Sequence, residues 1–145
     1  MNIVVLGSGG WGTALAMLLE QNRHTVTLWS HDPKKAEQLK LKRENPLLTG
    51  VQLPVELQIT NDLNCLRNAE LVVFASPSFA LRAVAKEAAP YLPDGVPLFL
   101  FVGRLMWYKG LHIILDALRA LREQGQDFRM VFIGAGGDEK EVRAE

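Results

Sequence analysis

The sequence has little cysteine, no long hydrophobic run and no excess of charge of either sign. The 145 residues contain one cysteine, Cys65, which excludes an internal disulfide and predicts a half-buried thiol in a reducing compartment. The apolar runs are much shorter than the roughly 20 residues that cross a bilayer. No basic segment precedes an apolar one at the N-terminus, so we expect no signal peptide and a cytoplasmic protein.

The balance of charge also limits the partners that we expect. The 16 basic and 16 acidic residues cancel, and this gives no reason to expect nucleic acid or an anionic membrane as a partner. A hydrophobic content of 48% is that of a folded globular protein and excludes a disordered chain. We identify no metal-binding residues, so a nucleotide or phosphate ligand is the expected partner. The protein is expected to be a monomer, or a dimer formed through an exposed edge strand.

Apolar strand-like runs alternate with helix-like segments along the chain. The predicted strands are 3–6, 25–29, 57–60, 70–75, 98–102 and 129–133. The predicted helices are 13–21, 33–42, 63–68, 79–89, a segment from 111 that ends near Gly125, and a last one after Asp138. This alternation is typical of βαβ units. It predicts an α/β, Rossmann-like, doubly wound parallel sheet of six strands in the order 3-2-1-4-5-6, with three layers, in a single domain 1–145.

Polar residues and prolines mark several helix ends. Asp32 followed by Pro33 predicts an N-cap and a first helical position. Ser78 is predicted to cap the helix 79–89, and Pro90 to stop it. A face formed by Leu111, Ile114, Leu115, Leu118 and Leu121 predicts an amphipathic helix.

A glycine-rich stretch follows the first strand. "VLGSGGWGTALA" contains Gly7-x-Gly9-x-x-Gly12 between a strand and a helix, with a second strand ending about 20 residues later. Gly7 would permit a tight turn, Gly9 would let backbone approach a pyrophosphate, and Gly12 would let the helix pack close to the strand. The alternative is that the glycines serve only the turn. The predicted cofactor-binding residues here are Gly7, Ser8, Gly9, Gly10, Trp11 and Gly12.

The end of the second strand bears on the choice of cofactor. A site that prefers NAD usually has a carboxylate here for the ribose 2′-hydroxyl, but Ser30 and His31 come first and Asp32 is expected to cap a helix. His31 could donate to a 2′-phosphate, or be an exposed loop histidine. Ser30 and His31 are therefore predicted cofactor residues, and NADP, or both NADP and NAD, are the expected cofactors.

Residues 1–97 resemble the N-terminal domain of bacterial NAD(P)-dependent glycerol-3-phosphate dehydrogenase. The resemblance is carried by "GSGGWGTALA", "LWSHDP", "ENPLLTGVQLP", "ITNDL" and "ELVVFASPSFALRAV". It implies that Ser76, Pro77 and Ser78 line the cofactor path. Phe79 and Arg82 are placed nearby by the same resemblance, although helix packing and solvent exposure explain them equally well. The family's helical second domain, which supplies the catalytic lysine, is not in this sequence.

Residues 98–145 resemble the nucleotide-sugar-binding domain of GT-B-fold glycosyltransferases of the glycogen-synthase-like group. The resemblance is carried by "LFLFVGRLMWYKGLHIILDALRALREQGQDFRMVFIGAGGDEKEV". It implies that Arg104 and Lys109 bind a diphosphate. The planar, two-pronged guanidinium of Arg104 and the point charge of the Lys109 ammonium, on one loop, could neutralise two phosphates. The alternative is that both are solvated loop cations. Trp107 and Tyr108 are expected to pack over the sheet edge rather than to stack on a base.

Two resemblances that meet in one βα pattern predict an engineered chimera with its seam near Val96–Leu98. A natural dehydrogenase with a recombination scar is the rival interpretation. Because no residue is assigned as a catalytic acid or base, we expect no enzyme, no catalytic residues, and weak or vestigial binding of NADP or NAD. The chain could also be an NAD(P)-binding fragment of glycerol-3-phosphate dehydrogenase, or a weak nucleotide-sugar binder.

Overall fold

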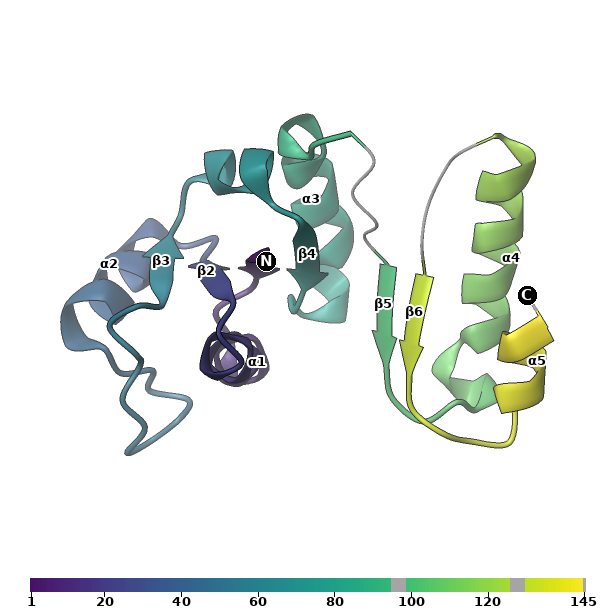
Figure 1. Cartoon of the computed structure of the whole chain (residues 1–145), viewed down its shortest axis with the longest axis horizontal. Coiled ribbons are helices and arrows are strands. Elements are labelled where there is room, and N and C mark those ends of the chain that lie inside the picture. The colour runs from purple at the N-terminus through teal and green to yellow at the C-terminus, as the bar shows by residue number, and fades with distance from the viewer. Residues whose placement is uncertain (95–98, 126–129, 145) are drawn as a thin grey trace. The chain divides into compact units, whose positions relative to one another are not determined.

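The chain divides into two compact units, Met1–Val96 and Pro97–Glu145 (Figure 1). The structure, a computed structural model, describes residues 1–94, 99–125 and 130–144. The predicted seam near Val96–Leu98 coincides with the division, and its residues lie outside the described ones. The single domain predicted for 1–145 stays a prediction.

The first unit contains a parallel sheet of four strands in the order β3-β2-β1-β4. The strands are β1 Asn2–Leu6, β2 Thr25–Trp29, β3 Gln58–Thr60 and β4 Leu71–Phe74. In the register of the central strand, Leu6 lies opposite Trp29 on one side and Phe74 on the other. This order and direction confirm an α/β, Rossmann-like arrangement and bring the carboxyl ends of β1, β2 and β4 together.

Helices connect the strands of the first unit. They are α1 Gly10–Gln21, α2 Pro33–Lys42, the 3₁₀ helix η1 Leu63–Asn68, α3 Ser78–Ala88 and the 3₁₀ turn η2 Ala89–Tyr91. α1 contacts β1 and β2, and α2 contacts β3. The sheet core contains the fully buried side chains of Val5, Leu6, Leu28 and Val72. Burial of a side chain of this size stabilises the fold by about 1.5–3 kcal/mol. This core holds the strands, and therefore their carboxyl ends, in fixed positions.

The second unit has two parallel strands and two helices. Its elements are β5 Phe99–Val102, the 3₁₀ turn η3 Trp107–Lys109, α4 Leu111–Glu123, β6 Met130–Ile133 and α5 Glu139–Ala144. β5 and β6 pair from Phe99 opposite Met130 to Val102 opposite Ile133. The predicted apolar face of α4 is confirmed, because Leu111 and Leu115 are buried and Ile114, Leu118 and Leu121 are half-buried. The predicted first residues of the two strands, Leu98 and Arg129, lie outside the described residues.

The six-stranded count of the predicted sheet is not shown. In the described part of the chain, four strands form one sheet and β5 and β6 form another. Hydrophobic runs mark where strands form, whereas the pairing of two edges depends on contacts between distant residues. The order 3-2-1-4 within the first sheet is confirmed.

The predicted helix starts give a mixed result. Asp32 caps α2 as predicted, since its Oδ1 accepts a hydrogen bond of 2.9 Å from the backbone N–H of Lys34, with Pro33 in the first turn. The capping role predicted for Ser78 is wrong, because α3 begins at Ser78 and Pro77 occupies the cap position. Proline has a fixed φ that suits the entry to a helix, and this explains the shift by one residue.

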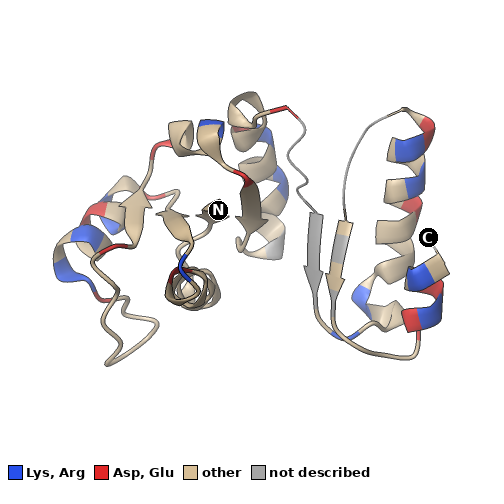
Figure 2. Cartoon of the chain, viewed as in Figure 1, with Lys and Arg blue, Asp and Glu red and all other residues tan. Residues whose placement is uncertain are grey.

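Two kinds of feature are absent from the described residues. No helix there is long and apolar enough to span a membrane. No group of three or more histidine, cysteine or acidic side chains there could hold a metal ion. The charged side chains are spread over the helices, with basic residues along α2 (Figure 2).

Candidate functional site: a pocket at the glycine loop

The glycine loop joins β1 to α1 by a turn that requires glycine at its first position. Gly7 has φ +129°, and a Cβ on it would lie 2.7 Å from the carbonyl oxygen of Ala75, at the end of β4. The backbone N–H of Gly7 donates to the carbonyl oxygen of Trp29 over 3.0 Å. The turn is therefore held between the ends of β2 and β4, and the role predicted for Gly7 is confirmed.

The remaining two motif glycines differ in their surroundings. A Cβ on Gly12 would collide with the carbonyl oxygen of Gly7, so α1 packs against the turn backbone to backbone. This confirms the packing role predicted for Gly12. A Cβ on Gly9 would have no atom within 4 Å, so Gly9 faces open space beside the N-terminus of α1. Free N–H groups and the helix dipole make such a position favourable for an anion.

Buried polar side chains fix the shape of this loop. The Ser8 hydroxyl donates to the hydroxyl oxygen of Ser30, at the end of β2, over 2.8 Å, and both residues are buried. The side-chain amide of Asn45 donates to the carbonyl oxygen of Ser8 over 3.1 Å and to the Thr13 hydroxyl oxygen over 2.7 Å. The Ser76 hydroxyl donates to the carbonyl oxygen of Leu6 over 3.1 Å. The loop is thus tied to β2, to β4 and to the segment that follows α2.

A pocket of about 490 Å³ opens at this edge of the sheet. Its lining comes from the glycine loop, the end of β2, the turn after β4 and one face of α3. The predicted site residues that line it are Gly7, Ser8, Gly9, Ser30, His31, Ser76 and Pro77. The volume falls within the range of ordinary small-molecule sites, and the position is the one at which α/β sheets bind ligands.

Some predicted residues lie outside the lining of this pocket. Gly10 and Gly12 do not line it, and neither does Trp11, whose side chain is 83% exposed. Phe79 is also largely exposed and does not line the pocket, and Arg82 is exposed on α3. The first half of the loop thus lines the pocket, and Gly12 acts on the packing beneath it.

The two carboxylates that line the pocket, those of Asp32 and Glu87, each have a partner. Asp32 is engaged as the cap of α2, and the hydroxyl of Ser30 is engaged with Ser8. His31 is exposed, lies edge-on to the Trp29 ring with 5.8 Å between ring centroids, and has its Nδ1 3.6 Å from Oε2 of Glu87. An exposed pair of this kind contributes little stability, so the imidazole can turn towards a ligand.

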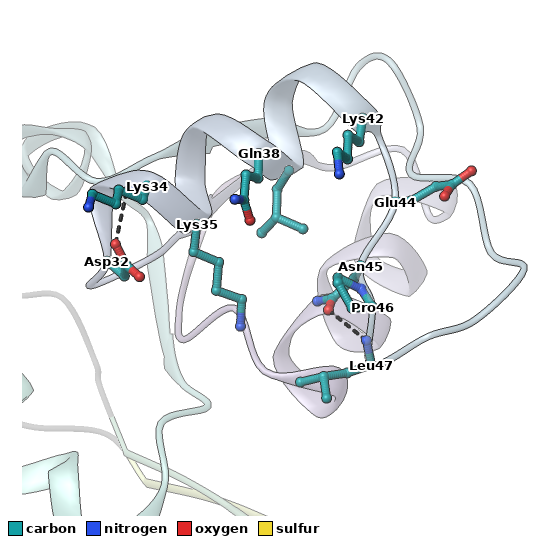
Figure 3. A pocket seen from close by; sticks show the side chains of 10 residues that line it. Asp32, Lys34, Lys35, Gln38, Lys42, Glu44, Asn45, Pro46 and Leu47 are labelled. Atoms are coloured by element: carbon teal, nitrogen blue, oxygen red, sulfur yellow. Dashed lines mark hydrogen bonds between the residues drawn. The ribbon is translucent and has the colours of Figure 1, made fainter.

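A second pocket of about 470 Å³ lies along α2 (Figure 3). Lys34, Lys35 and Lys42 line it, together with Glu44 and Asn45. Figure 3 shows the Lys35 side chain extending from α2 towards Leu47. Asp32, Lys35 and Leu47 line both pockets, so the half-buried Lys35 is the cation that the first pocket shares with the second.

The second unit contains the two remaining predicted phosphate-binding residues. Arg104 and Lys109 are both exposed, and Lys109 Nζ lies 5.7 Å from the centre of the Tyr108 ring. The turn that carries Arg104 is braced against the segment after β6. The N–H of Leu105 donates to the carbonyl oxygen of Ala135, and the N–H of Asp138 donates to that of Leu105, each over 3.1 Å. Trp107 lies edge-on to Tyr108, and both are exposed.

Two residues that the sequence interpretation missed belong to the first site. Asn45 stands in a segment predicted only as a loop, and Lys35 stands in a helix predicted only from its cap. Asn45 is followed by Pro46, and this pair is a turn signal that could have drawn attention to it. The sequence carries no signal that singles out Lys35 among the lysines of α2.

Comparison with known proteins identifies the relatives of this chain. The family profile "NAD-dependent glycerol-3-phosphate dehydrogenase N-terminus" matches residues 2–121. The glycerol-3-phosphate dehydrogenase (NAD(P)+) of Fusobacterium nucleatum subsp. nucleatum is 43% identical over 96 residues, which are 65% of this chain and 29% of that protein. The enzyme of the same name from Chlorobium luteolum is 47% identical over 88 residues, 59% of this chain and 26% of that protein.

The fold has a solved counterpart in the same group of enzymes. The crystal structure of glycerol-3-phosphate dehydrogenase from Coxiella burnetii matches with a TM-score of 0.64 and 28% identity, over 67% of this chain and 30% of that chain. The chain thus spans less than a third of the length of these relatives. The profile match extends beyond the predicted seam, and neither the glycosyltransferase-like segment nor the chimera is supported by these matches.

The prediction that this is not an enzyme is contradicted. The relatives are named glycerol-3-phosphate dehydrogenases, which are oxidoreductases. The prediction rested on the lack of a second domain after residue 97, and the point at which a sequence ends says nothing about the chemistry of its family. The weak or vestigial character expected for cofactor binding has no support either. The chain belongs to the family of NAD-dependent glycerol-3-phosphate dehydrogenase N-terminal segments.

Proposed function

We propose that the unit Met1–Val96 binds a nicotinamide dinucleotide in the pocket at the glycine loop. The observation that carries this proposal is the open space at Gly9, beside the N-terminus of α1 and inside a pocket of about 490 Å³. A pyrophosphate at Gly9 would meet free N–H groups and the positive end of the helix dipole. One mononucleotide half would lie towards Ser30 and Lys35 and the nicotinamide half towards Ser76 and Pro77.

We further propose that the pocket prefers NADP(H) to NAD(H). One oxygen of Asp32 is engaged as a helix cap, which leaves this carboxylate less suited to hold a ribose 2′-hydroxyl as in an NAD site. The half-buried Lys35 lines the same part of the pocket and offers a cation to that phosphate. His31 offers a second donor once it leaves Glu87.

We propose that the activity to which this chain contributes is that of a glycerol-3-phosphate dehydrogenase. The support is the named activity of the relatives. When bound, the dinucleotide would accept a hydride in its oxidised form or donate one in its reduced form. The residues of this chain bind and orient it, and the substrate and a proton-transfer group must then be held at the nicotinamide.

Tryptophan fluorescence tests the binding proposal directly. Trp29 lines the pocket, whereas Trp11 and Trp107 are exposed, so the variant Trp11→Phe/Trp107→Phe leaves Trp29 as the single reporter. We expect a saturable change of fluorescence with NADPH and a weaker one with NADH. No saturable change up to millimolar NADPH would overturn the proposal, and equal affinities would overturn the preference for NADP(H).

We propose a second, separate function for the unit Pro97–Glu145, namely weak binding of a nucleotide-sugar diphosphate by Arg104 and Lys109. Its support is the turn Gly103–Met106, which carries Arg104 and is hydrogen-bonded to the segment after β6. The side chains of Arg104 and Lys109 are both exposed and so are accessible to a ligand. The proposal also rests on the resemblance of residues 98–145 to a GT-B-fold domain. Titration with UDP-glucose tests it, with Arg104→Ala as the variant that must lose binding.

A further inference from the structure

The Asn45 side chain is buried at the junction of three segments. It is 1% exposed, and its two N–H groups donate to the carbonyl oxygen of Ser8 and to the hydroxyl oxygen of Thr13. Its Oδ1 accepts a hydrogen bond of 3.1 Å from the backbone N–H of Leu47, drawn as a dashed line in Figure 3. Only one orientation of the amide satisfies all three partners, because a carbonyl can only accept and a backbone N–H can only donate.

The bond to Ser8 sets the direction of the next peptide group. In a trans peptide, the C=O of one residue and the N–H of the next point in opposite directions, and no cis peptide bond occurs among the described residues. Because Asn45 holds the Ser8 carbonyl towards the protein interior, the Gly9 N–H points the other way. That N–H makes no hydrogen bond to any residue in the described part of the chain, and the space beside Gly9 is open.

We propose that Asn45 is a positioning residue, which orients the Ser8–Gly9 peptide so that the Gly9 N–H faces the pyrophosphate of the bound dinucleotide. This inference rests on the dinucleotide binding proposed above. It assigns to Asn45 an effect on affinity in addition to its contribution to folding. Without the amide, the Ser8 carbonyl oxygen loses its hydrogen-bond donor. Rotation of the Ser8–Gly9 peptide would then turn this oxygen towards the phosphates and repel them.

The test compares NADPH binding by three chains, each with Trp29 as the single tryptophan. The variants are Asn45→Ala and, as a matched control for lost stability, Leu66→Val, which shortens a fully buried side chain in η1 that lines neither pocket. We expect Asn45→Ala to weaken NADPH binding about tenfold, as for loss of one hydrogen bond to a charged group. Leu66→Val is expected to lower the midpoint of urea unfolding and to leave the dissociation constant within about twofold.

A second measurement does not depend on the variant folding. In the unchanged chain, the ¹H–¹⁵N signal of Gly9 is followed by NMR during titration with NADPH and with inorganic pyrophosphate. We expect a saturable downfield shift with both ligands, and loss of that shift in a folded Asn45→Ala variant.

The outcomes separate this inference from the function on which it rests. If the unchanged chain does not bind NADPH, the proposed function fails and the role of Asn45 falls with it. If the unchanged chain binds NADPH but the Gly9 signal does not move, the role of Asn45 alone is overturned. Binding by Asn45→Ala that equals that of Leu66→Val would overturn it as well.

Discussion

Gly12 lies so close to the carbonyl group of Gly7 that no side chain fits between them. The first turn of α1 therefore rests directly on the end of β1. A Cβ on Gly12 would also lie 3.0 Å from the Cβ of Ala75, at the end of β4. The spacing between the first and last glycines of the motif thus serves the contact between the helix and two strands, independently of any ligand.

Replacement of Gly12 is expected to damage the fold. Gly12→Ala forces α1 away from the backbone of Gly7, and overpacking of this kind costs about 1–3 kcal/mol. The measurement is the free energy of unfolding in urea, followed by circular dichroism. A Gly12→Ala variant as stable as the unchanged chain would contradict this packing of α1 against the turn.

Replacement of Gly9 is expected to damage binding instead. Gly9 has φ −67° and ψ 175°, which any residue adopts, and a Cβ there meets no atom within 4 Å. Gly9→Ala should lower the stability of the fold by no more than about 1 kcal/mol, because Gly9 is the N-cap of α1 and alanine is a poorer N-cap than glycine. It should weaken NADPH binding about tenfold or more, since its methyl group occupies the space proposed for the pyrophosphate. Unchanged affinity would place the phosphates elsewhere.

Replacement of Lys35 is expected to change the choice of cofactor. Lys35→Gln removes the cation shared by the two pockets, and we expect a loss of about tenfold in NADPH affinity with little change for NADH, which has no 2′-phosphate. Lys34→Gln is the matched control, since Lys34 lines only the second pocket. Equal losses for NADPH and NADH would show a general effect of charge rather than recognition of the 2′-phosphate.

Cys65 is expected to make the stability fall in alkali. Burial, and after it the charge of Asp62, raises the pKa of the Cys65 thiol from 9.0 to about 11. Between these two values the unfolded chain loses its thiol proton while the folded chain keeps it, so the free energy of unfolding decreases as pH rises from about 9 to 11. Cys65→Ala should lack this component. In the folded chain, the rate of alkylation by iodoacetamide should rise towards a pH of about 11 rather than 9.

The local structure of the first unit could be predicted largely from the sequence. β2 and α2 have the predicted boundaries, because the run Thr25–Trp29 is bounded by polar residues and the pair Asp32-Pro33 marks a helix start. The structural roles of Gly7 and Gly12 follow from their spacing. In each case the pattern that predicts the feature lies within a few residues in the sequence.

Interactions between distant residues account for what could not be predicted. The contact of Asn45 with Ser8 spans 37 residues, and no periodic pattern encodes it. The pairing of strand edges also depends on contacts between residues that are distant in the sequence. Lys35 lines both pockets because of the way α2 lies against the following segment. The sequence alone does not distinguish Lys35 from the other lysines of α2.

The bonds that hold the glycine loop have a kinetic consequence. Ser8 is held through its carbonyl by Asn45 and through its hydroxyl by Ser30, so the loop has its shape before any ligand arrives. The conformational entropy of the loop is therefore lost during folding, and binding does not have to order the loop again. Binding to a loop that is already ordered needs no conformational step, so association should be limited by diffusion and orientation. The observed rate constant of association should then rise in proportion to ligand concentration without reaching a plateau.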